Sequence, residues 1–234
     1  MFEVIVVTPD EARVAEAGGA DRLELVSALS EGGLTPGFGL LKHVVAAVAI
    51  PVNVMIRPHA RGFRYRDSEV EVMIDEIQAA REAGANGVVL GVLDEAHRVH
   101  RGHLEKLLSC AEGLEVTFHR AIDAAEGPVA AARVLSHYPQ IRTLLSSGGP
   151  GRIEDQTGVL ASMRAAAHPI RIMAGGGLTL ANTARIVQEG GVHDCHYGTA
   201  VRRGGAVDGE LDPAALGDLK RLLVHNGVTT GALA

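Results

Sequence analysis

Aromatic side chains are scarce in this sequence, which has no tryptophan, four phenylalanines and three tyrosines among 234 residues. Proteins that bind single-stranded nucleic acids stack the bases on exposed aromatic rings, so this composition argues against such a platform. Positive charge is also limited, because 22 Lys and Arg residues face 28 Asp and Glu residues and the formal net charge is −6. A surface for phosphate backbones or anionic lipids needs an excess of cations. We therefore expect neither a nucleic acid nor a membrane as a partner.

Cysteine is equally rare, since only Cys110 and Cys195 occur and they lie far apart in the sequence. Two distant cysteines do not make the disulfide framework of a small secreted protein. No run of about 18 apolar residues predicts a transmembrane helix. The first residues, Met-Phe-Glu-Val, lack the basic and apolar regions of a signal peptide. These absences predict a cytoplasmic protein.

Lysine occurs only as Lys42, Lys106 and Lys220, each within a predicted helix. An aldolase of the Schiff-base type needs a lysine at a strand end inside its pocket, so that class is excluded. The first predicted strand ends in Val-Val-Thr, without the His-x-His of hydrolytic zinc barrels. The missing residues thus exclude two common chemistries of barrel-shaped enzymes.

What the sequence does contain is a regular alternation of short apolar runs with helical patterns. The predicted strands are residues 2–7, 20–26, 51–57, 87–93, 115–119, 141–146, 169–174 and 192–197. Thr8 is the expected cap of the first helix and Thr179 that of the seventh. Strict alternation implies parallel strands, and eight units predict a single (β/α)8 TIM-type barrel domain over residues 1–234. The alternative is a doubly wound sheet, but the turn after its first strand would carry glycines, which this turn lacks.

Polar residues gather where the predicted strands end, which is where barrels of this kind place their sites. Successive side chains of a barrel strand face the interior and the helix layer in turn. This alternation directs Glu24, Arg57, His119 and His196 inward, and Asp123 follows in a loop. We interpret Glu24, Arg57, His119 and Asp123 as candidate catalytic residues. Glu24 or His119 would transfer protons, Arg57 would hold a carboxylate or phosphate, and Asp123 would orient its neighbours. A structural interpretation stays open, with Glu24 paired to Arg57, His119 in the core and Asp123 capping a helix.

Two glycine-rich turns follow the seventh and eighth predicted strands. Their candidate anion-binding or phosphate-binding residues are Gly175, Gly176, Gly177, Gly198 and Thr199. Backbone N–H groups and a helix N-terminus favour an anion at this corner of a barrel, and Arg202 and Arg203 would add positive charge. We expect an anion there, although glycine-rich turns also arise from packing alone.

A divalent metal ion on Glu24, His119 and His196 is a further possibility for the same mouth. Glu3 begins the first strand, so we expect it at the opposite face of the barrel in a structural role. Alternation along the fifth strand turns Arg120 outward, unless the strand has already ended.

His97, His100 and His103 have a spacing that would suit a metal cluster. They lie in a polar segment that also contains Arg98 and Arg101, and we interpret them as a solvated surface.

Several longer motifs resemble the CutC family, whose members are named copper homeostasis proteins. They are Ala-Asp-Arg-Leu-Glu-Leu at 20–25, Glu-Gly-Gly-Leu-Thr-Pro at 31–36, Ile-Arg-Pro at 56–58, Thr-Phe-His-Arg-Ala-Ile-Asp at 117–123 and Ile-Met-Ala-Gly-Gly-Gly at 172–177. The resemblance covers residue 2 to about residue 196. It implies a TIM-type barrel, a cytoplasmic homo-oligomer (dimer or tetramer), and copper as the bound ion.

Family members proposed to bind copper(I) carry cysteines near the end of the first strand and after the Glu-Leu of the second. This sequence has Ile-Val-Val and Leu-Val-Ser there, whereas copper(I) prefers thiolate or thioether ligands. Two functions therefore compete. One is a CutC-like copper homeostasis protein with copper-ion binding. The other is a barrel enzyme that acts on a small anionic or phosphorylated substrate by acid–base chemistry.

Overall fold

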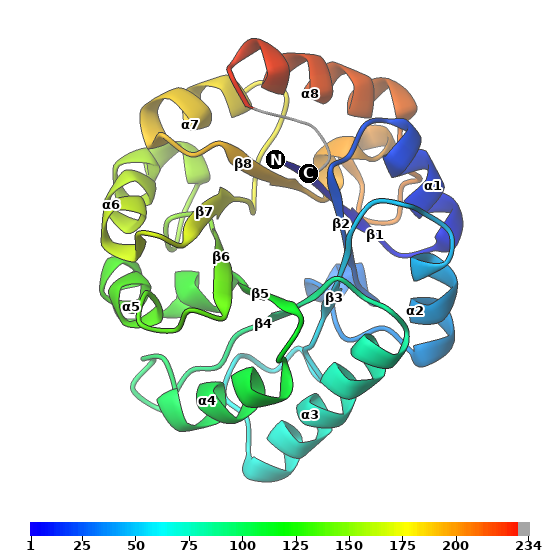
Figure 1. Cartoon of the computed structure of the whole chain (residues 1–234). Helices are drawn as coiled ribbons and strands as arrows, with labels where there is room; N and C mark the ends of the chain where they lie inside the picture. Colours follow the sequence, from blue (N-terminus) through cyan, green and yellow to red (C-terminus); the bar gives the residue numbers. More distant parts are fainter. Residues whose placement is uncertain (229–234) are drawn as a thin grey trace.

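Eight parallel strands form a closed barrel in sequence order, with a ring of helices outside it, in this computed structural model (Figure 1). The structure describes residues 1–228. The strands are β1 (Phe2–Val6), β2 (Arg22–Leu25), β3 (Val52–Met55), β4 (Gly87–Leu90), β5 (Glu115–Phe118), β6 (Ile141–Ser146), β7 (Arg171–Ala174) and β8 (Asp194–Tyr197). The prediction of a (β/α)8 barrel is confirmed.

One α-helix follows each strand. The helices are α1 (Pro9–Ala17), α2 (Phe38–Val45), α3 (Asp67–Glu82), α4 (Arg101–Cys110), α5 (Pro128–Leu135), α6 (Thr157–Ala167), α7 (Thr183–Gly190) and α8 (Pro213–His225). Short 3₁₀ helices occupy several loops, among them η2 (Arg120–Ala124) after β5 and η4 (Thr199–Val201) after β8. Within residues 1–228, no helix is long and apolar enough to cross a membrane.

Local capping explains where the helices begin. Thr8 accepts a hydrogen bond from the N–H of Glu11, as the capping signal predicts, and α1 starts at Pro9. The predicted cap at Thr179 is wrong, because α7 starts at Thr183 with Asn182 at its N-cap position. Thr179 and Asn182 instead exchange backbone-to-side-chain hydrogen bonds in both directions, and this closed turn delays the helix.

The two faces of each strand meet different surroundings. In β8, Cys195 and Tyr197 belong to the large apolar core between strands and helices, whereas His196 lies inside the barrel. Barrel interiors are usually filled by branched aliphatic residues. This interior instead contains many buried polar side chains, among them Glu3, Arg22, Glu24, Asn53, Thr117 and Thr143. Because buried charges are costly unless they are paired, their partners determine what the interior does.

Candidate functional site

A cavity of about 600 Å³ opens at the carboxyl ends of the strands. The predicted residues that line it are Glu24, Arg57, His119, Asp123, Gly176, Gly177, His196, Gly198 and Thr199. Gly175 lies against His196 and Leu145, since a Cβ atom built on it would be 3.1 Å from the His196 Cβ and 2.6 Å from the Leu145 Cδ1. The strand-end residues therefore share one mouth, as the barrel geometry requires.

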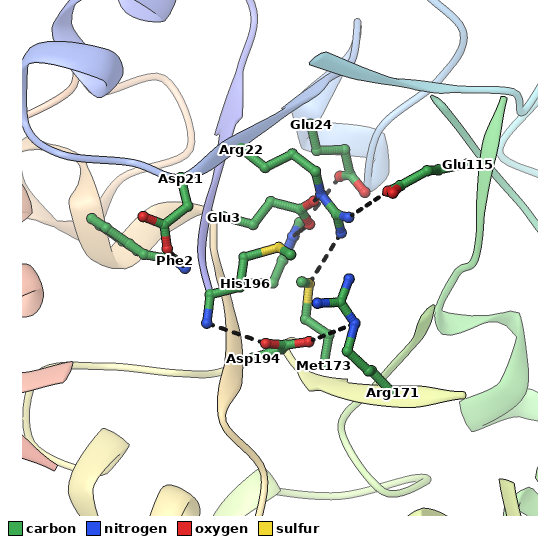
Figure 2. A network of polar contacts seen from close by, with 11 residues as sticks. Phe2, Glu3, Asp21, Arg22, Glu24, Glu115, Arg171, Met173, Asp194 and His196 are labelled. Atoms are coloured by element: carbon green, nitrogen blue, oxygen red, sulfur yellow. Dashed lines mark hydrogen bonds and ion pairs between the residues drawn. The ribbon is translucent and has the colours of Figure 1, made fainter. Parts of the chain in front are cut away.

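The cavity leads to a buried cluster of Glu3, Glu24 and His196 (Figure 2). One ligand atom from each residue lies within 4.8 Å of the others. The His196 Nδ1 is 2.7 Å from a Glu3 oxygen, and the His196 Nε2 is 3.8 Å from a Glu24 oxygen. The remaining Glu24 oxygen, Oε1, is buried and has no hydrogen-bond partner among the described residues. His119, expected in a metal set with Glu24 and His196, is not part of this cluster.

The expected position of Glu3 at the opposite face is corrected by the strand register. Glu3 pairs with Arg22 across β1–β2 and with His196 across β1–β8, so its side chain lies inside the barrel between these two residues. The Arg22 Nε donates to a Glu3 oxygen at 2.5 Å, while the Arg22 Nη1 is 3.4 Å from Glu115 (Figure 2). Glu3 therefore forms a buried ion pair with Arg22, which is a structural role, and it also contacts His196 directly.

The charges of this cluster follow from burial and from the neighbours. Burial raises the pKa of Glu3, but Arg22 and His196 outweigh that effect and hold this pKa at about 2. Burial raises the pKa of Glu24 to about 7, against the influence of His196. Burial lowers the pKa of His196, but Glu24 and Glu3 reverse this and the net shift is upward. Glu3 is thus ionised at neutral pH, whereas Glu24, which lines the cavity, has a pKa that allows it to exchange a proton near neutral pH.

His119 lies elsewhere in the mouth and has a different chemical state. Its Nδ1 accepts a hydrogen bond from the N–H of Ala121 at 3.1 Å, so in the neutral ring the proton is on Nε2. Burial, with Arg57 adding repulsion, lowers the pKa of His119 to about 3. The Nε2 atom is buried and has no partner among the described residues. His119 is therefore a neutral hydrogen-bond donor, and this tautomer leaves no nitrogen free for a metal ion.

Arg57 does not form the ion pair with Glu24 that the structural interpretation would require. Its Nη1 donates to the carbonyl oxygens of Glu31 at 2.9 Å and Gly33 at 3.0 Å. Its guanidinium lies 5.2 Å from the centre of the Phe63 ring, and that ring also lies 5.1 Å from His119. Sequence patterns did not indicate Phe63, because it comes from the loop after β3 where alternation gives no direction.

Arg120 lines the cavity, so the exception to its outward orientation applies. Strand β5 ends at Phe118, so the alternation rule no longer applies at Arg120. The Arg120 Nε donates to Asp123 at 2.9 Å, and its Nη2 lies 3.2 Å from the Ser147 Oγ. A Cβ atom at Gly176 would overlap the Arg120 guanidinium, so the glycine permits this close approach.

Asp123 holds the ends of β5 and β6 together. Its carboxylate accepts hydrogen bonds from the Ser146 hydroxyl at 2.5 Å and from the Ser147 hydroxyl at 2.8 Å. It also accepts from the N–H of Ser147 and from Arg120. Through these hydrogen bonds Asp123 fixes the Arg120 side chain and the start of the loop after β6.

The two arginines expected beside the glycine turns form ion pairs elsewhere. Arg202 is buried and binds Glu11 of α1 at 2.7 Å. Arg203 is exposed and lies 3.6 Å from Glu210. Neither lines the cavity, whereas Arg120 does and its guanidinium lies against Gly176.

The histidines after β4 have structural partners. The His100 Nδ1 accepts from the N–H of His103 at the start of α4, and the two rings stack 3.7 Å apart. The His103 Nε2 is 3.0 Å from Asp67. Among the described residues, these histidines form no group that could hold a metal ion.

Neither cysteine lines the mouth. Cys195 is buried in the layer between strands and helices, where burial raises the pKa of its thiol to about 12. Cys110 ends α4. Met55 is the sulfur-containing residue at the cavity wall. One thioether without a thiolate is a poor ligand set for copper(I), whereas imidazole and carboxylates suit copper(II).

Comparison with known proteins shows which proteins this chain resembles in sequence. The family model described as "CutC family" matches residues 1–201. A human protein named "Copper homeostasis protein cutC homolog" is 40% identical over 196 residues, which cover 84% of this chain and 72% of the human one. A CutC protein of Pasteurella multocida is 38% identical over 195 residues, 83% of this chain and 80% of the relative.

Solved structures give the same result. CutC from Streptococcus agalactiae matches with a TM-score of 0.78 and 30% identity, and the match covers 84% of this chain and 97% of that one. A phosphoribosyl anthranilate isomerase from Thermococcus kodakaraensis matches with a TM-score of 0.62 at 17% identity. The second likeness shows the barrel fold alone.

Proposed function

We propose a role in copper homeostasis, through binding of a copper ion, for this chain, which belongs to the CutC family. The human and mouse relatives, 40% and 39% identical, carry the name copper homeostasis protein. The family membership rests on the match over residues 1–201 and on the solved CutC structure with the same barrel. The transfer of the role to this chain is the step that needs a test.

The observation that carries the proposal is the buried cluster of Glu3, Glu24 and His196. Glu24 and His196 line the cavity, so they are the side chains that an incoming ion meets first. Glu3 lies behind them with one oxygen held by Arg22 and the other by His196. One imidazole and two carboxylates are ligands for copper(II), and the distant thiols make copper(I) the poorer fit.

Copper uptake by the metal-free protein tests this proposal. We expect one equivalent of copper(II) per chain and weak retention of copper(I) under reducing conditions. Glu24→Gln and His196→Gln should each weaken copper(II) binding at least tenfold, while His103→Gln, which changes a histidine outside the cluster, should not. Equal copper(II) affinity in all variants would contradict the assigned site. Tight copper(I) binding that disappears in Cys110→Ser would show that the copper site uses the Cys110 thiol and not the cluster of Glu3, Glu24 and His196.

We also propose a second candidate function, an enzyme acting on a small anionic substrate, and its support is the set of groups that share the mouth. Arg57, His119 and Arg120 line the same cavity as Glu24. Two guanidinium groups and a neutral donor suit an anion, and a carboxyl group beside them suits proton transfer. The glycine turn at Gly176 would lie against the same anion.

The second candidate function is tested by measuring whether small anions bind to the protein and are turned over by it. In a panel of carboxylated and phosphorylated compounds, at least one should raise the melting temperature of the metal-free protein. Glu24→Gln and His119→Ala should abolish turnover of the active compound while the melting temperature stays near that of the original protein. A panel without any stabilising anion would remove this candidate.

Location and assembly stay predictions. The family resemblance supports a cytoplasmic homo-oligomer, a dimer or a tetramer, and the low cysteine content also supports the cytoplasmic location. Light scattering on the purified protein measures the assembly, and a monomer at micromolar concentration would contradict it.

A further inference from the structure

Three arginines are buried in the described part of the chain, and one of them differs from the others. Arg22 pairs with Glu3, and Arg202 pairs with Glu11. Arg57 is 7% exposed, yet no carboxylate of residues 1–228 lies within ion-pair distance of it, and its Nε has no hydrogen-bond partner there. A buried cation without a counter-charge is costly. Arg57 is therefore a cation whose environment calls for an anion.

His119 offers a second buried donor beside it. The ring is 3% exposed, and its Nε2–H has no partner among the described residues. Phe63 contacts both residues, with its ring centre 5.2 Å from the Arg57 guanidinium and 5.1 Å from the His119 ring. All three residues line the same cavity. The two donors are thus held on one wall, around one aromatic ring.

Arg120 brings a third donor group to the same region. Its charge reaches His119, because it is one of the cations that lower the pKa of His119. Its Nε and Nη2 are held by Asp123 and Ser147, and its side chain is 48% exposed. A guanidinium fixed on one edge keeps its other nitrogen free to bind an oxyanion.

We propose that Arg57 and the Nε2–H of His119 bind the oxyanion group of a small organic acid, a carboxylate or a phosphate, with Arg120 as the outer contact. This inference rests on the second candidate function and names the groups that hold its ligand. The anion supplies the counter-charge of Arg57 and accepts the hydrogen bond of His119. Phe63 provides an apolar surface for the adjoining carbon atoms. Glu24 and His196 lie in the same cavity and are left for a metal ion or for proton transfer.

Calorimetric titration of the metal-free protein with malonate and with inorganic phosphate tests the proposal, and malonamide is the neutral control. We expect one anion bound per chain, weakened by added chloride, and no binding of malonamide. Binding of malonate alone would assign the site to carboxylates, and binding of phosphate alone would assign it to phosphates.

Variants separate this site from a general attraction of anions. Arg57→Gln should weaken binding at least tenfold. His119→Phe, which removes the donor, should weaken it about fivefold to tenfold, whereas His119→Gln, which keeps an N–H₂ at nearly the same place, should restore most of it. Arg185→Gln, an exposed arginine paired with Glu189 on α7, should bind as the original protein does.

Two results would overturn the inference in different ways. Undiminished binding in Arg57→Gln and His119→Phe, with loss in Arg120→Gln, would move the anion to the glycine turn and leave the small-anion enzyme standing. A weak small ligand has a dissociation constant on the order of millimolar, so each anion is tested at about 10 millimolar. If neither anion binds at this concentration, both this site and the second candidate function are removed. Copper binding would be unaffected by either result.

Discussion

At the scale of single residues, His119 shows how one hydrogen bond decides the chemistry of a side chain. The N–H of Ala121 takes the lone pair of Nδ1, and burial beside Arg57 keeps the ring neutral. An imidazole in an exposed position would be a base, a metal ligand or a cation, depending on pH. Here the one nitrogen that is left without a partner among the described residues, Nε2, can only donate, in a residue that lines the cavity.

The neutral state of His119 predicts a pH dependence of stability. In the unfolded chain this histidine takes a proton below its ordinary pKa of 6.5, but in the folded protein only near pH 3. Between these values the unfolded state binds more protons, so stability falls as the pH is lowered. From pH 7 to pH 5 the loss from this residue is about 2 kcal/mol.

Urea unfolding at pH 7 and pH 5, compared between the original protein and His119→Gln, measures this contribution. Glu24 acts in the opposite direction, because its pKa of about 7 favours the folded state as the pH is lowered, and it contributes equally to both proteins. The variant should lose less stability on acidification. The same loss in both proteins would show that His119 is already protonated when folded.

At the scale of elements, the mouth depends on how closely neighbouring strand ends approach each other. After β4, a Cβ atom on Gly91 would lie 2.5 Å from the His119 Nδ1 and 2.9 Å from the Ala121 Cβ. The residue that follows β4 must therefore be small for the His119 ring to take its position after β5.

Gly91→Ala should displace the His119 ring and destabilise the protein by about 1–3 kcal/mol, the usual cost of overpacking. Gly102→Ala is the matched control, because its nearest neighbour would be 3.8 Å away and alanine favours the helix it occupies. Thermal unfolding compares the two variants. If Gly91→Ala were as stable as Gly102→Ala, the close approach of β4 and β5 would have no structural importance.

Asp123 gives a second prediction at this scale. It joins η2 to the end of β6 through both serines and holds Arg120. Hydrogen bonds to a charged group contribute about 1.5–3 kcal/mol each, and they are partly shared here. Asp123→Ala should therefore cost about 3 kcal/mol or more.

Denaturant unfolding of Asp123→Ala beside Glu126→Ala, an exposed residue of the same loop, provides the comparison. The control should stay within about 0.5 kcal/mol of the original protein. A loss in Asp123→Ala no larger than in the control would mean that Asp123 is not the residue that positions Arg120.

At the scale of the whole molecule, the barrel is closed around buried charges as well as apolar side chains. Arg22 from β2 contacts Glu3 of β1, Glu115 of β5 and the Met173 sulfur of β7 (Figure 2). One guanidinium thus connects four strands, and it also sets the charge of the carboxylate that binds His196.

Arg22→Met should destabilise the protein by about 3–5 kcal/mol, because it leaves Glu3 buried without its cation. The double variant Arg22→Met with Glu3→Gln should recover part of that loss, since no unpaired charge remains. Arg13→Met, which breaks only an exposed pair with Asp10, should change stability by less than about 1 kcal/mol. A double variant no more stable than Arg22→Met would show that packing, and not charge, explains the effect.

The sequence by itself determined the number and order of the elements and the inward direction of Glu24 and His196, which lie within β2 and β8. These features depend on local periodicity and on alternation within a strand, both of which are visible in a single chain. It also determined that no thiol pair stands at the mouth.

Only the tertiary structure decided which of these inward residues meet. Glu3 reaches His196 because the strands of a closed barrel are staggered, and that register is a property of neighbouring strands. Arg120 enters the cavity because β5 ends before it, and Arg57 is without a carboxylate because Glu24 lies outside ion-pair distance. Beyond a strand end the backbone has no period, so the partners there follow from packing in three dimensions.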